Sequence, residues 1–209
     1  MPERVRIQLA VTALIAVSGF PVDLARAEGQ QNIKGSAEAK EAPIEVSSVA
    51  YNGSSVKAGR AVGIVDAPLE TVLAIVEDYA GYEKFMPHFR ASRVLSRRGS
   101  SALVYMQASI ARDTMTLWAQ LKVGPKANSG TARVIEAKMV QGNMDAMQAR
   151  WELSAVDPQH TLVAFQLLMD PKVPLPASLV SDENEKAAQK TIRALRRVAA
   201  ERVPGTAKR

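Results

Sequence analysis

The architecture of this chain depends on residues 176–203, PASLVSDENEKAAQKTIRALRRVAAERV, because no other stretch can form a long amphipathic helix. Small or apolar residues recur here at spacings of seven and of three to four, which places them on one stripe of a helix. The opposite face is charged, with acidic residues early and basic residues late, as the helix dipole favours. The stripe must be buried, and its short side chains leave room for a cavity against a sheet. It consists of Val180, Ala187, Thr191, Leu195 and Val198.

Two further elements precede the sheet that this helix would cover. The runs 44–50 and 56–65 have β-type composition and flank the turn residues Asn52-Gly53-Ser54, which predicts an opening hairpin. Pro68 stands where a first-turn proline is tolerated, so a helix is expected to start there and to end near Gly81. The predicted buried side of this helix consists of Leu69, Val72, Leu73, Val76 and Tyr79.

From residue 91 the sequence changes to short runs with a period of two, each closed by turn residues. Nearly every connection has the length and composition of a hairpin, which predicts an antiparallel meander. The expected fold class is α+β, a strongly curved antiparallel sheet with the long C-terminal helix in its concavity, because this arrangement buries the apolar side of both elements. The six runs are 91–97, 102–111, 113–123, 131–140, 146–156 and 161–170.

The segment DYAGYEKFMP at residues 78–87, followed by SRVL at 92–95, resembles the signature of START-like domains. The nearest branch is the coenzyme-Q-binding and polyketide-cyclase-like group. The order of elements is also similar to the helix-grip fold of these domains, so the resemblance covers residues 44–203. Relatives bind lipids, quinones, sterols or polyketides between sheet and helix, and only some of them are enzymes. The resemblance therefore implies a helix-grip fold and a site for a hydrophobic ligand.

The first 27 residues are typical of a secretory signal peptide. They contain Arg4 and Arg6, an apolar run from residue 7 to 17, and the pattern Ala25-Arg26-Ala27 of a cleavage site. An uncleaved anchor is the alternative, but the run is shorter than the ~20 residues that a spanning helix needs. We therefore expect export to the periplasm. The expected regions are a signal peptide at 1–27, a flexible leader at 28–43, one domain at 44–203 and a disordered tail at 204–209.

Composition limits the partners of the exported chain. Loss of the signal peptide removes three of the 27 basic and two of the 21 acidic residues, which leaves a formal charge of +5. This modest excess argues against nucleic acid as a partner. It is consistent with transient contact with an anionic membrane surface, and equally with ordinary solubility charge. The chain has no cysteine, so the domain relies on its core, and a lipid-modified cysteine anchor is excluded.

Motifs for catalysis or cofactor binding are scarce. The only histidines are His88 and His160, and cysteine is missing, so we expect no metal site of the usual zinc type. The sequence also lacks the serine-hydrolase elbow and the glycine-rich nucleotide and dinucleotide loops, so no cofactor is expected. A lone histidine near aromatic residues, such as His88, is more often a packing or surface residue than an acid or base. We therefore assign no catalytic residue.

The leading hypothesis is a carrier that shields a lipid, a quinone or a sterol-like compound from water without a catalytic step. Six of the eight methionines fall in the sheet region, and methionine adapts to irregular apolar ligands, although gap-filling in an ordinary core explains them equally well. The main alternative is a cyclase- or hydrolase-type enzyme in the same cavity, and the third is a protein-interaction module. The expected ligand-binding residues are Phe85, Met86, Met115, Leu117, Met147, Trp151, Phe165, Leu167, Val180, Ala187 and Thr191.

Overall fold

The computed structural model describes residues 42–110, 115–126 and 131–202, which form a single antiparallel sheet with its helices. The spatial order of the strands is β1-β2-β8-β7-β6-β5-β4-β3. The opening hairpin and the meander of six strands are therefore both confirmed. The strands are β1 (Glu45–Val49), β2 (Ala58–Val65), β3 (Phe89–Arg98), β4 (Ser101–Ile110), β5 (Met115–Pro125), β6 (Arg133–Gly142), β7 (Met144–Asp157) and β8 (His160–Pro171).

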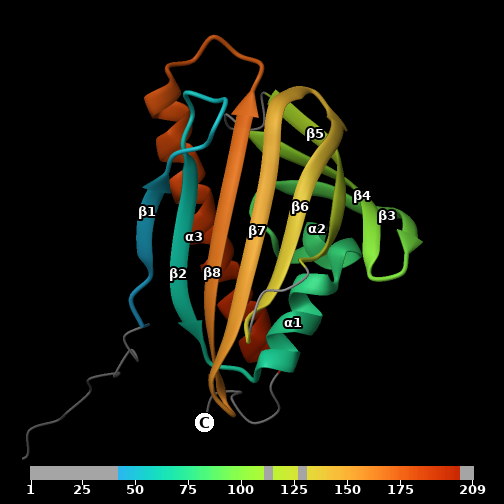
Figure 1. Ribbon diagram of the computed structural model, residues 1–209, viewed down its shortest axis with the longest axis vertical. Coiled ribbons are helices and arrows are strands. Elements are labelled where there is room, and N and C mark those ends of the chain that lie inside the picture. The colour runs from blue at the N-terminus through green and yellow to red at the C-terminus, as the bar shows by residue number, and fades with distance from the viewer. Residues whose placement is uncertain (1–41, 111–114, 127–130, 203–209) are drawn as a thin grey trace, which may run out of the picture. The chain divides into compact units, whose positions relative to one another are not determined.

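The opening hairpin is joined to the meander through β8, the last strand of the meander. Strand β2 pairs antiparallel with β8, from Gly59 opposite Leu167 to Val65 opposite Thr161. The Thr161 hydroxyl is buried and donates to the carbonyl oxygen of Ala67 over 2.8 Å, which fixes the chain where it leaves β2. This pairing places the long helix α3 (Ala177–Arg202) behind β1, β2 and β8 in the view of Figure 1.

The segment after Pro68 is divided into three short pieces, so the prediction of one helix ending near Gly81 is wrong. Helix α1 (Leu69–Glu77) is followed by a 3-10 turn, η1 (Tyr79–Gly81), and by α2 (Tyr82–Phe85). The break occurs at Asp78, whose backbone leaves helical geometry (φ −77°, ψ 64°). The Asp78 carboxylate accepts the Gly81 N–H over 3.1 Å and so stabilises a tight turn that a continuous helix could not contain.

The buried face of α3 agrees with the predicted stripe at four of its five positions, Val180, Thr191, Leu195 and Val198. Ala187 is the exception, because it is only half-buried, whereas its neighbour Ala188 is fully buried and packs into the main core together with Ile192. The buried face is also wider than the predicted stripe. The buried residues are Val180, Ser181, Asn184, Ala188, Thr191, Ile192, Ala194, Leu195, Val198 and Ala199.

The predicted signal peptide, most of the flexible leader and the C-terminal tail lie outside the described residues. The last part of that leader is held in place, because the Arg196 guanidinium donates to the carbonyl oxygens of Ala42 and Ile64, over 2.8 Å in each case. Among the helices of the described ranges, none combines the length and the apolar composition needed to cross a membrane.

Candidate ligand-binding site

The first half of α3 lies directly against the backbone of β2. A Cβ atom built on Gly59 would lie only 2.2 Å from the backbone carbonyl of Asn184, so the contact needs a residue without a side chain. Asn184 is almost fully buried, and its amide group bridges β8 and the residue that precedes β2. Its Nδ2 donates to the carbonyl oxygens of Lys57 and Met169, and its Oδ1 accepts the Met169 N–H. This end of the helix is therefore clamped to the sheet.

The signature segment forms the wall that joins α1 to the sheet. The hydroxyl of Tyr82 is buried and donates to the carbonyl oxygen of Val76 over 2.6 Å. Ser92 on β3 is also buried, and its hydroxyl donates to the carbonyl oxygen of Tyr79 over 2.5 Å. Both bonds tie side chains to backbone carbonyls of the broken helix, and the Tyr79 carbonyl also accepts the backbone N–H of Tyr82. The polar residues of the signature thus stabilise the conformation of this segment against β3.

The aromatic residues of this segment pack edge to face. The ring of Tyr82 contacts those of Tyr79, Phe85 and Phe89, with centroid separations of 6.1, 5.4 and 6.2 Å. Burial raises the pKa of Tyr79 to about 12, and it raises the pKa of the fully buried Tyr82 further. Both phenols stay protonated at neutral pH, so neither can serve as a general base there.

Nine of the eleven predicted ligand-binding residues meet in one apolar cluster between the concave face of the sheet and the helices. Val180 does not join them, because it packs in a separate, smaller cluster with Val56, Ala58 and Leu168. Thr191 is buried beside the main cluster, and its hydroxyl has no hydrogen-bond partner among the described residues. The nine are Phe85, Met86, Met115, Leu117, Met147, Trp151, Phe165, Leu167 and Ala187.

Acids and bases stay out of this cluster. The buried polar side chains of the described ranges, apart from the two phenols, are hydroxyls and one amide. His88 is exposed, in a turn with φ 65°, and His160 is half-exposed at the start of β8, where its Nδ1 lies 2.7 Å from the Asp157 carboxylate. The arrangement therefore offers a large apolar surface and the Thr191 hydroxyl rather than acid–base chemistry.

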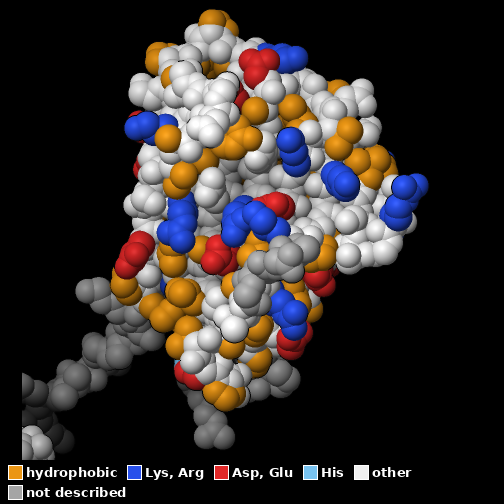
Figure 2. Space-filling model, in the orientation of Figure 1, with side chains coloured by type: hydrophobic (Ala, Val, Ile, Leu, Met, Phe, Trp, Pro, Cys, Tyr) orange, Lys and Arg blue, Asp and Glu red, His pale blue; other side chains and the backbone are white. Residues whose placement is uncertain are grey.

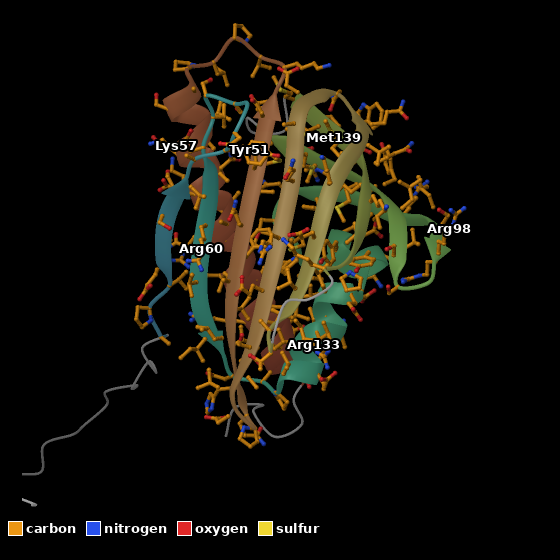
Figure 3. All side chains as sticks on the ribbon, in the orientation of Figure 1. Tyr51, Lys57, Arg60, Arg98, Arg133 and Met139 are labelled. Atoms are coloured by element: carbon orange, nitrogen blue, oxygen red, sulfur yellow. The ribbon has the colours of Figure 1, made fainter. Side chains whose placement is uncertain are left out.

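A hollow of about 170 Å³ lies on the outer face of the sheet and shares no residue with the predicted site. Tyr51 reaches over it from the β1–β2 connection, as Figure 3 shows, and accepts a hydrogen bond from Gln148. Arg150 in this hollow is paired with Glu136 at 2.7 Å and with Glu152 at 3.3 Å. Because these ion pairs occupy the Arg150 guanidinium, we assign the charged residues of the hollow a structural role and not a ligand-binding one.

The family described as "polyketide cyclase / dehydrase and lipid transport" matches residues 65–196, which is more than half of the chain. The chain belongs to this family. The resemblance to START-like domains of the polyketide-cyclase branch is thereby confirmed. A comparison with curated protein sequences gave no match.

Solved structures share the fold of this polyketide cyclase and lipid transport family member at low sequence identity. A START superfamily protein from Mycobacterium smegmatis is 19% identical, with a TM-score of 0.61, over 70% of this chain and 99% of its own. A STAR-related lipid transfer protein from Xanthomonas axonopodis is 17% identical, with a TM-score of 0.65, over 75% and 93%. The Zhui aromatase/cyclase from Streptomyces sp. R1128 is 16% identical, with a TM-score of 0.53, over 73% and 98%.

Three residues that shape the site of this family member were not among those predicted from the sequence. Gly59 and Asn184 set the distance between β2 and α3, and Ala188 is fully buried in the main cluster, against which Ala187 packs only in part. Two of them carry a signal in the sequence. A glycine inside a strand run often marks a close backbone approach, and an amide in line with an apolar helical stripe indicates a buried anchor.

Proposed function

We propose that this family member is an exported carrier that holds a hydrophobic molecule between the concave face of its sheet and α3. The observation that carries this proposal is the convergence of nine predicted residues from α2, the strands and α3 in one apolar cluster, beside the Thr191 hydroxyl, for which no described residue provides a hydrogen-bond partner. A lipid, a quinone or a sterol-like compound with one polar group matches such a lining. Transient contact with an anionic membrane surface would be the step at which ligand is exchanged.

A cyclase- or hydrolase-type enzyme acting on a hydrophobic substrate is the second candidate. Similarity to the aromatase/cyclase from Streptomyces supports it at the level of the fold. The carrier is favoured because an enzyme of this type needs titratable groups that converge on the substrate, and the buried phenols of Tyr79 and Tyr82 have raised pKa values.

We expect the protein purified from its native host to carry an extractable hydrophobic molecule. The apolar cluster excludes water, and a ligand bound there dissociates slowly enough to survive purification. Mass spectrometry of organic extracts measures this directly, with an unrelated exported protein purified in parallel as the control. An extract that contains nothing above this control would contradict the carrier function. Release of a chemically altered product from a supplied aromatic polyketide would instead support the enzyme.

We also expect the exported form to begin at Glu28. The pattern Ala25-Arg26-Ala27 provides the small residues that a signal peptidase requires, and the apolar run before it is too short for a stable anchor. Intact-mass measurement of the protein from a periplasmic fraction tests this expectation. Recovery of the full-length chain from the membrane fraction would contradict it, and replacing Ala27 with Arg should block cleavage if the assignment is correct.

A further inference from the structure

The outer face of the sheet carries cations without acidic partners over strands β3 to β6. Strands β3, β4 and β5 contain no aspartate or glutamate in their described residues. Arg93, Lys122 and Lys138 are exposed on these strands and on β6, and none of them forms an ion pair in the described part of the chain. Towards the upper right of Figure 2, basic side chains are accordingly interspersed with hydrophobic ones and not with acidic ones.

Two of these cations stand directly opposite each other. Lys122 on β5 is the register partner of Lys138 on β6, and like charges in this position destabilise a sheet. Their other cross-strand neighbours, Leu103 and Gln148, supply no negative charge. The nearest acid on β6, Glu136, is already paired with Lys126 and Arg150. Within the described part of the chain, this face therefore keeps a pair of positive charges without an acidic partner.

Protection of a sheet edge does not explain these lysines. Charged residues on an edge strand prevent unwanted pairing with other chains, and this accounts for Arg93 and Arg98 on β3. Arg98 lies at the β3–β4 turn at the far side of the domain, as Figure 3 shows. Lys122 and Lys138, however, lie on strands with neighbours on both sides, where no edge needs protection.

An aromatic pair adjoins the cations on the same face. Tyr105 and Trp118 are half-buried, and their rings stack with centroids 6.1 Å apart and an interplanar angle of 27°. Their side chains point outward, because they alternate with buried residues along β4 and β5. Val140, at an irregularity of β6 in the same region, has 66% of its surface exposed. The face thus combines cations, amphipathic rings and an exposed aliphatic side chain.

We propose that this outer face, defined by Arg93, Tyr105, Trp118, Lys122 and Lys138, docks on an anionic phospholipid bilayer. The cations bind the headgroups, and the amphipathic rings lie at the depth of the interface. Nucleic acid matches the face less well, because each ring already covers part of the other and leaves few free ring surfaces for bases. The assignment rests on the membrane contact in the proposed function but not on the identity of the ligand.

Vesicle binding of the purified protein tests the docking face. We expect partition into phosphatidylcholine vesicles with about 30% phosphatidylglycerol, and little into phosphatidylcholine alone. Trp118 reports the contact, because the only other tryptophan, Trp151, is buried. The tryptophan fluorescence should shift to shorter wavelength when vesicles are added, and Trp118→Phe should abolish this shift. The double variant Lys122→Gln/Lys138→Gln should bind about 30-fold more weakly, from about fivefold for each charge.

A control variant removes two positive charges from a region outside the docking face. Lys57 lies beside α3 and Lys190 lies on α3, and both are exposed and away from the docking face. The double variant Lys57→Gln/Lys190→Gln should therefore bind vesicles as the wild type does. The assignment would be overturned if both double variants weakened vesicle binding equally, or if the protein partitioned equally into neutral and anionic vesicles. It would also be overturned if the protein did not partition into vesicles at all, or if it bound a single-stranded oligonucleotide more tightly than vesicles. Hydrophobic material extracted from each variant is measured in parallel, so that loss of docking is distinguished from loss of the carried molecule.

Discussion

Gly59→Ala is expected to lower the melting temperature of the domain by about 8 °C or more, the largest stability effect of any single methyl group that we foresee. The added Cβ would lie 2.2 Å from the carbonyl carbon and oxygen of Asn184 and 2.3 Å from the backbone nitrogen of Glu185. Backbone atoms of a helix cannot rotate away as a side chain can, so α3 must move off β2. A cost of about 3 kcal/mol or more follows for such overpacking, and thermal unfolding followed by circular dichroism measures it.

Gly63→Ala is the matched control, because Gly63 lies four residues further along the same strand and on the same face. Its added Cβ would first meet the Arg196 guanidinium at 3.0 Å and a methyl group of Ile192 at 3.3 Å, so these side-chain atoms need to shift by only a few tenths of an ångström. Neither glycine has a positive φ angle, so alanine is compatible with the backbone at both sites. Equal melting temperatures for the two variants would show that α3 does not touch β2 as described.

Ala187→Phe is expected to reduce the retained hydrophobic molecule at least ~10-fold while the melting temperature of the ligand-free protein changes by less than about 3 °C. Ala187 is half-buried at the edge of the main cluster, so a phenyl ring there can occupy the space proposed for ligand without displacing packed atoms. Mass spectrometry of extracts and thermal unfolding of the ligand-free protein measure the two effects separately.

The adjacent Ala188 provides the contrast for this experiment. It is fully buried in the main core, so Ala188→Phe must push packed side chains apart and should cost about 1–3 kcal/mol or more. If Ala187→Phe instead destabilises the protein as strongly as Ala188→Phe and leaves the extract unchanged, the region beside Ala187 is packed core and the ligand lies elsewhere.

The fold could be predicted well because its main signals are local. Alternation with a period of two identified all six strands of the meander, and turn residues marked their connections, so that boundaries agree within a few residues. The break at Asp78 was missed because apolar residues continue at helical spacing through Tyr79. The turn there is stabilised by the Gly81 N–H, which donates to both the backbone carbonyl and the carboxylate of Asp78, and local bonds of this kind leave no periodic trace in the sequence.

The packing of the residues proposed for the site was predicted in part. Nine residues chosen for their apolar character and strand face lie in one cluster, because the face of a strand follows from its alternation. Val180 packs elsewhere, and Ala188 replaced Ala187 as the fully buried residue of its turn. Adjacent helical positions point about 100° apart, so the rotation of α3 about its axis decides which of two neighbours, such as Ala187 and Ala188, is fully buried and which lies at the boundary of the buried face.

Periodicity and turn chemistry alone are sufficient to specify the element order, the antiparallel meander and the need for α3 to cover the sheet, because each of these depends on neighbours along the chain. The rotation of α3, its contact with Gly59, the opposed Lys122 and Lys138, and the stacked Tyr105 and Trp118 depend on the register and spacing of elements far apart in sequence. Such distances result from packing the whole core at once, and no local pattern of residues encodes them.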